Sequence, residues 1–393
     1  MTNNKEKKVL NVPNSTDRGN VIRNVPALRF PEFTDEWKKI RLDSFTERVM
    51  RKNKNNLSKL PLTISAQYGL VDQITFFNKV VASTDMSNYY LLKKGEFAYN
   101  KSYSSDYPWG AIKRLDNYEQ GALSSLYICF APKDNVETDF ILQYFESPKW
   151  HKGVSEIAVE GARNHGLLNI SVQDFFHTHH YMPKDKKEQA KIAKLLMFLD
   201  ERIATQNKII ERYESLIRGI AQKIARNNKP NVLLAECLKC SSSTLQESDV
   251  CESGTYPVYG ANGIIGYLDG YSTEDEAVHI IKDGSGVGTV YYVTGKCSAT
   301  GTLNTLQAKD GYLLQYLYYM LKVFNFEPYK TGMAIPHIYF KDYGKTKIFC
   351  PSYTEQLKYV GVLSAIDNKL SVELSILTNL SLQKQYLLRQ MFI

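Results

Sequence analysis

Two long stretches of the chain carry apolar residues at alternating steps of four and three. The first spans residues 185–228 and contains no proline. A seam of this spacing, sustained along the whole stretch, predicts a long helix of a coiled coil. The predicted seam of this helix is Ile192, Leu196, Leu199, Ile203, Gln206 and Ile210, and it continues to Ile224.

The second stretch, residues 354–393, repeats this pattern when the first seam is moved on by 167 positions, as from Gln206 to Glu373. Its seam is Leu363, Ile366, Leu370, Glu373, Leu377 and Leu380. If the helices pair antiparallel, Gln206 and Glu373 should lie close together and fix the register. The alternative is that each helix packs only on its own globular unit.

Each long stretch follows a globular segment, residues 25–184 and 229–353, and the two segments echo each other. The sequence of residues 140–145 returns at 312–317. We predict an α+β (mixed) fold: two globular α/β domains joined by two long helices in an antiparallel coiled coil, with a pseudo-two-fold internal repeat. Residues 1–24 are polar and predict a flexible tail.

Short alternating segments within both domains predict strands, and two apolar segments predict short helices. The predicted strands are 62–65, 95–100, 123–130, 175–181, 277–282, 289–293 and 346–349; the predicted helices are 139–145 and 311–323.

Composition limits the setting of the chain. The net charge of +8 is compatible with a nucleic-acid partner without requiring one. No apolar run is long enough for a membrane span, and nothing at the N-terminus resembles a signal peptide. The six cysteines are scattered, so a cytoplasmic protein without a disulfide framework is expected.

Motifs for catalysis or cofactor binding are missing. The cluster Gly284, Gly286 and Gly288 is followed by a predicted strand rather than a helix, which favours a hairpin over a nucleotide site. Cys237 and Cys240 have no further ligands at zinc spacing. Residues 177–180 hold three histidines in a predicted strand, where a role on the strand surface is favoured over metal binding. A non-catalytic chain without its own cofactor or metal is expected.

Together these features resemble the specificity subunits of type I restriction-modification systems. The resemblance covers nearly the whole chain and rests on several segments as a set. They are the entry segment 28–37, residues 67–70 and 95–102, the Pro and Glu-Gln helix starts at 183–189 and 351–356, and residues 256–267.

The resemblance implies that each globular segment is a target recognition domain that reads one half of a bipartite, asymmetric site in double-stranded DNA. The coiled coil would space the halves and dock two methyltransferase subunits, which restriction (translocase) subunits would join. S-adenosylmethionine, ATP and Mg would then belong to those partners.

The expected DNA contacts lie in loops whose side chains suit phosphates or base edges. They are Arg51, Lys52, Gln67, Tyr68, Lys101, Tyr103, Arg163, Asn164, Tyr259, Asn262 and Lys282. Two other interpretations stay open: a coiled-coil scaffold with two ligand-binding modules, and a similar reader that serves another DNA-modifying defence complex.

Overall fold

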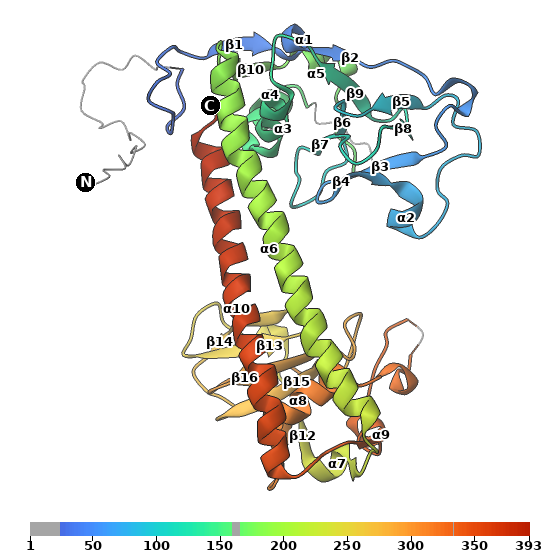
Figure 1. Cartoon of the computed structure of the whole chain (residues 1–393), viewed down its shortest axis with the longest axis vertical. Coiled ribbons are helices and arrows are strands. Elements are labelled where there is room, and N and C mark those ends of the chain that lie inside the picture. The colour runs from blue at the N-terminus through green and yellow to red at the C-terminus, as the bar shows by residue number, and fades with distance from the viewer. Residues whose placement is uncertain (1–23, 159–165, 333) are drawn as a thin grey trace, which may run out of the picture. The chain divides into compact units, whose positions relative to one another are not determined.

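The computed structural model describes residues 24–158, 166–332 and 334–393. Contacts divide the chain into two compact units, residues 1–204 with 378–393 and residues 205–377. Each long helix therefore contributes one part to each unit, whereas the sequence suggested helices separate from the globular domains. Figure 1 shows the elements in chain order.

The first unit alternates short strands with short helices before its part of the long helices. Its elements are β1 Lys38–Arg41, α1 Leu42–Phe45, β2 Thr46–Arg48, η1 Lys54–Asn56, β3 Pro61–Ser65, β4 Gly69–Asp72, α2 Gln73–Phe77, β5 Tyr90–Lys93, β6 Phe97–Asn100, β7 Ala111–Arg114, β8 Gln120–Leu123, β9 Ile128–Pro132, α3 Thr138–Glu146, η2 Pro148–Trp150, α4 His151–Ser155, α5 Val172–His177 and β10 His179–Met182.

The second unit has the same style of alternation. Its elements are β11 Val232–Leu233, α7 Leu234–Cys237, β12 Leu238–Ser242, η3 Glu247–Asp249, β13 Tyr256–Gly260, β14 Gly263–Leu268, β15 Glu276–Ile281, β16 Val290–Thr294, β17 Ser298–Ala299, β18 Leu303–Ala308, α8 Leu314–Lys322, η4 Glu327–Tyr329, α9 Phe340–Tyr343 and β19 Lys347–Ile348.

The sheets of the two units share one connectivity. The order β2-β9-β6-β7 in the first unit corresponds to β12-β18-β15-β16 in the second, and the pair β1-β10 corresponds to β11-β19. The remaining sheets, β4-β3-β8-β5 and β14-β13-β17, each join an antiparallel hairpin to a parallel neighbour. Within the described residues, α2, β5 and α4 have no counterpart in the second unit.

The two long helices are α6 Lys186–Asn227 and α10 Tyr353–Gln390, within two residues of the predicted starts and three of the predicted ends. The predicted seam is largely buried: Ile192, Leu196 and Leu199 belong to the core of the first unit, and Ile210, Leu363 and Leu370 to that of the second. Apolar burial along this stripe is what stabilises long helices in proteins.

Polar contacts join α6 to α10 inside each unit. In the second unit, Gln206 Nε2 donates to the Glu373 carbonyl at 3.0 Å and to the Glu373 carboxylate, so the predicted proximity of these residues is confirmed. In the first unit, Lys384 Nζ lies 2.5 Å from Asp200 Oδ1.

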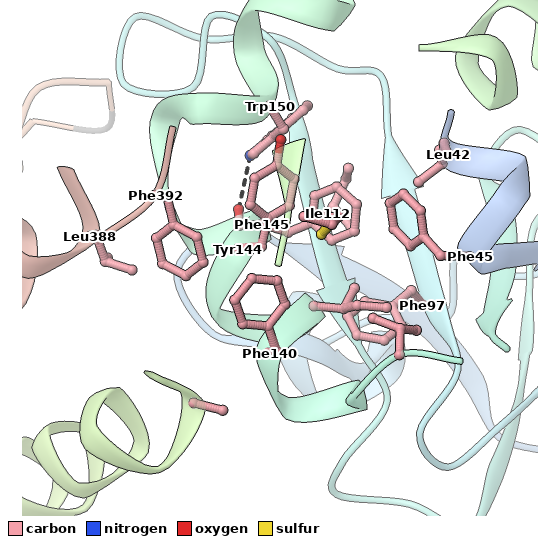
Figure 2. Packing of buried hydrophobic residues seen from close by; sticks show 14 of the residues in the cluster. Leu42, Phe45, Phe97, Ile112, Phe140, Tyr144, Phe145, Trp150, Leu388 and Phe392 are labelled. Carbon is pink, nitrogen blue, oxygen red and sulfur yellow. Dashed lines mark hydrogen bonds between the residues drawn. The ribbon is translucent and has the colours of Figure 1, made fainter. Parts of the chain in front are cut away.

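The core of the first unit is built around aromatic side chains of the β2-β9-β6-β7 sheet and α3. Figure 2 shows Phe140 and Tyr144 of α3 facing Phe392, which comes from the C-terminal end of the chain. The ring centroids of Phe140 and Phe392 lie 5.4 Å apart, and those of Tyr144 and Phe392 lie 5.7 Å apart. This packing holds the C-terminal end of the chain against α3 through dispersion and burial.

The repeat in the sequence differs from the repeat in the fold by one helical turn. The segments 140–145 and 312–317 are 172 residues apart, whereas α3 and α8 begin 176 residues apart, at Thr138 and Leu314. A shift of four residues keeps the same helix face toward the core, which explains why both spacings preserve the apolar pattern.

Most predicted strands and both short helices are confirmed, and two strand predictions are wrong. Residues 123–130 divide into β8 and β9, which lie in different sheets and are joined by a turn in which Tyr127 N donates to Ser124 O. Residues 175–181 divide into the end of α5 and β10. Ser171 caps α5 by accepting from Asp174 N, a local signal that outweighs the alternating pattern.

Within the described residues, no helix is long and apolar enough to cross a membrane.

Candidate nucleic-acid interface

Two hairpin tips occupy corresponding places in the two units. Ser65 pairs with Gly69 around a three-residue loop that contains Gln67 and Tyr68. Gly260 pairs with Gly263 around a two-residue loop that contains Asn262. Both loops end in a glycine with positive φ, +82° at Gly69 and +98° at Gly263, a conformation that side chains rarely adopt. Gln67, Tyr68 and Asn262 are all exposed, so amide and hydroxyl groups project from equivalent turns.

Two predicted lysines also occupy corresponding places. Lys101 follows β6 and Lys282 follows β15, which are equivalent strands. The carbonyl of Lys101 accepts from Leu168 N, and that of Lys282 from Ile338 N, both at 2.9 Å. Each strand end is thus held by the segment that leads back toward the long helix, so the two lysines have the same backbone setting.

In the second unit the hairpin and the strand end converge on one apolar cluster. Tyr259 and Ala261 pack against Ile281, Ala299 and Leu303. Asn262 follows Ala261 in the chain, and Lys282 follows Ile281. An amide and an ammonium group therefore flank the same cluster, which suits contacts to a base edge and a phosphate.

The corresponding convergence in the first unit is less direct. Ala66 packs against the cluster that includes Ala98 and Ala111. Ala111 pairs with Asn100, the residue before Lys101. Gln67 directly follows Ala66, which packs on this cluster, and Lys101 directly follows Asn100, which pairs with a member of it. Lys101 Nζ also donates to Ile170 O at 3.4 Å.

The basic loop of the first unit is tied into its own domain. Arg51 donates to both oxygens of Glu96, at 2.7 and 2.8 Å, and Lys52 Nζ donates to Asn88 O at 2.8 Å while lying 4.2 Å from the Tyr90 ring centroid. DNA contacts predicted for Arg51 and Lys52 would have to compete with these partners. Lys54 and Lys59 in the same loop are exposed.

The remaining predicted residues have unlike surroundings. Tyr103 is exposed, and its backbone N–H donates to Gly166 O. Tyr259 is half-buried, with its ring centroid 5.4 Å from that of His279, and burial raises the pKa of its hydroxyl. Arg163 and Asn164 lie outside the described residues.

One surface feature beside the first hairpin was missed from the sequence. Asp72 caps α2 by accepting from Ile74 N and Thr75 Oγ1, and the helix exposes Phe76 and Phe77. The Phe76 ring centroid lies 6.4 Å from that of Tyr68. The available signal was Asp72, an N-cap residue type placed directly after a strand.

The three histidines do not lie in one strand, as the sequence predicted, although His177 and His179 are exposed and His180 is buried on the opposite face. His177 ends α5, whereas His180 is buried between Tyr144 Oη and Thr178 Oγ1, at 2.8 and 2.7 Å. Burial lowers the pKa of His180 to about 3. His180 is therefore a neutral hydrogen-bonded group of the core.

Other potential chemistry has structural explanations. Gly284 to Gly288 lie in the connection between the antiparallel strands β15 and β16, as the predicted hairpin requires. Burial raises the pKa of Cys237 to about 12, so its thiol stays protonated at neutral pH. In the part of the chain that the structure describes, no three metal-ligating side chains cluster together.

Comparisons with known proteins support the resemblance inferred from the sequence. Residues 234–380 match the family model of the type I restriction modification DNA specificity domain. The chain is 28% identical over 116 residues to a type I restriction enzyme specificity subunit of Escherichia coli, covering 30% of this chain and 29% of that protein. A putative specificity subunit of Haemophilus influenzae is 29% identical over 123 residues, covering 30% and 32%. The matches thus span about a third of these two curated relatives.

Longer matches come from a third relative and from solved structures. A putative type I specificity subunit of Mycoplasma genitalium is 23% identical, covering 66% of this chain and 72% of that protein. The crystal structure of a type I S subunit from M. genitalium superposes with a TM-score of 0.59 at 18% identity, covering 94% and 99% of the two chains. A chain from a study of type I complex assembly gives a TM-score of 0.50 at 15% identity, covering 90% and 96%. The resemblance to type I specificity subunits is confirmed.

Proposed function

We propose that this chain, a relative of the type I specificity subunits, is the DNA sequence-recognition subunit of a restriction-modification complex. The globular domains of the first and second units, hereafter recognition domains 1 and 2, would each read one half of a split site. The observation that carries the proposal is the duplicated frame: equivalent hairpin tips hold Gln67 and Asn262, and equivalent strand ends are followed by Lys101 and Lys282.

The chemistry of these positions suits DNA. A lysine at a strand end can neutralise a phosphate, which gives affinity without sequence information. An exposed amide can donate to and accept from the edge of adenine in the major groove. Because the tips differ in both length and residues, we expect the two half-sites to be unlike, and a palindromic target would argue against the proposal.

The long helices would form the frame that spaces the half-sites, as an antiparallel coiled coil with a pseudo-two-fold. The buried seam and the Gln206 contact with Glu373 support this arrangement. A polar pair in an apolar seam disfavours slipped registers at some cost in stability. The outer surface of this coiled coil would dock two methyltransferase subunits, and restriction subunits would join them.

Catalysis would reside on those partners, with S-adenosylmethionine, ATP and Mg bound there. In this proposal the chain contributes binding and placement, and its effect on a methyltransferase is to choose the site. The expected activities of the complex are adenine methylation and ATP-dependent cleavage.

Methylome sequencing tests the proposal. A host without its own modification systems would carry the neighbouring methyltransferase gene with or without this chain. We expect a split, asymmetric motif to be methylated only when the chain is present. If the complex forms and no new motif appears, the scaffold interpretation replaces the proposed function.

A further inference from the structure

Two buried glutamines, one at the start of each long helix, make the same pair of hydrogen bonds. Gln189 Oε1 accepts from Glu137 N at 2.8 Å, and its Nε2 donates to Pro183 O at 2.9 Å. Gln356 Oε1 accepts from Leu313 N at 2.9 Å, and its Nε2 donates to Pro351 O at 2.9 Å. Gln189 is 3% exposed and Gln356 1%.

Each glutamine therefore connects three elements. Its own residue lies on the long helix, its oxygen satisfies the backbone N–H directly before α3 or α8, and its amide binds the chain that leads into the long helix. Helix starts leave backbone N–H groups without internal partners, and a buried one left unpaired is costly. A glutamine can satisfy one donor and one acceptor at once, which neither glutamate nor leucine can do.

A second contact lies farther along each long helix, at residues 200 and 367. Asp200 Oδ2 accepts from Gln143 Nε2 at 2.8 Å, and Asp367 Oδ2 accepts from Tyr319 Oη at 3.3 Å. On each long helix the glutamine and the aspartate lie eleven residues apart. Their partners in or directly before the short helix lie six residues apart, at 137 and 143 in the first unit and at 313 and 319 in the second. At 1.5 Å per residue, the long helix is held at points about 16 Å apart along its axis.

In each unit the two contacts follow the same order along the short helix and the long helix, so the short helix is held to its long helix at two points. Apolar packing also joins the long helices to the same cores. Hydrogen bonds are directional, so two of them fix the angle between the helices more narrowly than one does. The short helices pack into the cores of their domains through Phe140 and Tyr316, so the angle applies to the domain as a whole.

We propose that Gln189 with Asp200, and Gln356 with Asp367, are positioning residues that fix each recognition domain on its own long helix and thereby limit the spacer length that the DNA site can have. This inference rests on the proposed function. Adding one base pair to a spacer moves the half-sites by about 3.4 Å and turns them by roughly 35° relative to each other. A domain that can swing tolerates such a change, and a clamped one rejects it.

The test is the spacer distribution of methylated sites in the same host, with the full chain and its methyltransferase. Gln356→Leu and Asp367→Ala are the variants for recognition domain 2. Gln189→Leu and Asp200→Ala are those for recognition domain 1, and Asp200→Ala also removes the partner of Lys384. Gln383→Leu, at an exposed position of α10, is the matched control. We expect the variants to methylate sites with one base pair more or fewer about tenfold more often than the wild type, as the loss of one or two net hydrogen bonds allows. The half-site bases should stay the same.

If these residues only stabilise the fold, the variants will lower methylation at the normal spacer length and add none at spacers one base pair longer or shorter. That result would overturn the proposal that they limit the spacer length. If a leucine variant fails to assemble, Gln356→Glu keeps an oxygen for Leu313 N and loses the donor to Pro351 O. We expect it to relax the spacer less than leucine does; an assembled glutamate variant with the wild-type distribution would also overturn the clamp. A wild-type chain that directs no split motif overturns the proposed function itself, so the two failures are distinguishable.

Discussion

Recognition domains 1 and 2 share the strand order of their main sheets and their attachment to the long helices, and they differ at the tips of the hairpins β3-β4 and β13-β14. The tip in domain 1 has three residues and is flanked by α2 with exposed Phe76 and Phe77. The tip in domain 2 has two residues, and in the described chain β14 is followed directly by β15. The comparison teaches that the frame is kept where it meets α6 and α10, while the surface assigned to DNA is free to differ.

The frame common to both domains depends on the seam of the long helices, so breaking the seam should have the largest effect. Leu199→Asp combined with Ile366→Asp places one carboxylate in the core of the first unit and one against the core of the second, and an unpaired buried charge costs several kcal/mol. We expect loss of the complex with methyltransferase on a sizing column. Asn207→Asp, at an exposed position of α6, is the control. A double variant that still assembles would contradict the coiled-coil frame.

Acid should destabilise both domains through one buried histidine each. Burial lowers the pKa of His180 to about 3 and that of His279 to about 4, both below the ordinary value of 6.5. Below pH 6.5 the unfolded chain binds protons at these histidines that the folded chain does not bind. The free energy of unfolding therefore falls as the pH drops from 6.5 toward the lowered pKa values. At pH 5 the loss is about 2 kcal/mol for each histidine. Denaturant unfolding at pH 7 and pH 5 measures this loss of stability. An unchanged unfolding midpoint would contradict the buried, neutral state of the two histidines.

Replacing each of these two histidines by leucine should have different effects on stability at pH 7. Both nitrogens of His180 have partners, whereas neither nitrogen of His279 has one. His180→Leu leaves the Tyr144 hydroxyl unpaired and should cost about 1–3 kcal/mol. His279→Leu removes two unsatisfied atoms and should be neutral or stabilising. Thermal unfolding of the two variants decides this, and equal destabilisation would count against the difference.

The lysines at the equivalent strand ends should give the smallest effect. Lys101→Ala and Lys282→Ala should each weaken binding of the assembled complex to its target duplex and reduce the slope of log affinity against log salt by about 1. The two slopes should change alike because the backbone settings match. Lys345→Ala, an exposed lysine in a turn before β19, is the control. If neither slope changes, the two lysines do not contact DNA phosphates and the proposed interface is wrong at these positions.

The long helices, their seam and the Gln206–Glu373 contact could be predicted because heptad spacing is a local property of the sequence. The paired frame of sheets could not, because its strands are as short as two residues and pair with partners far along the chain. The boundary between α5 and β10 was missed since the cap at Ser171 opposes the alternation that follows.

For the candidate site, the sequence indicated residue types suited to DNA but not their geometry. That Gln67 and Asn262 lie at equivalent tips follows only from the pairing of β3 with β4 and of β13 with β14. The internal partners of Arg51 and Lys52 could not be foreseen, since Glu96 and Asn88 reach them through tertiary folding. The repeated Glu-Gln predicts a helix start, whereas the hydrogen bonds of Gln189 with Glu137 N and Pro183 O depend on tertiary folding.

The central claim is that two domains on one frame read two different half-sites. The most direct test is to compare the methylated motifs that Gln67→Ala and Asn262→Ala direct with the motif of the wild type. We predict that each variant relaxes base preference in one half, that the two variants affect opposite halves, and that the spacer is unchanged. Relaxation of the same half by both variants, or an unchanged motif in both, would contradict the account.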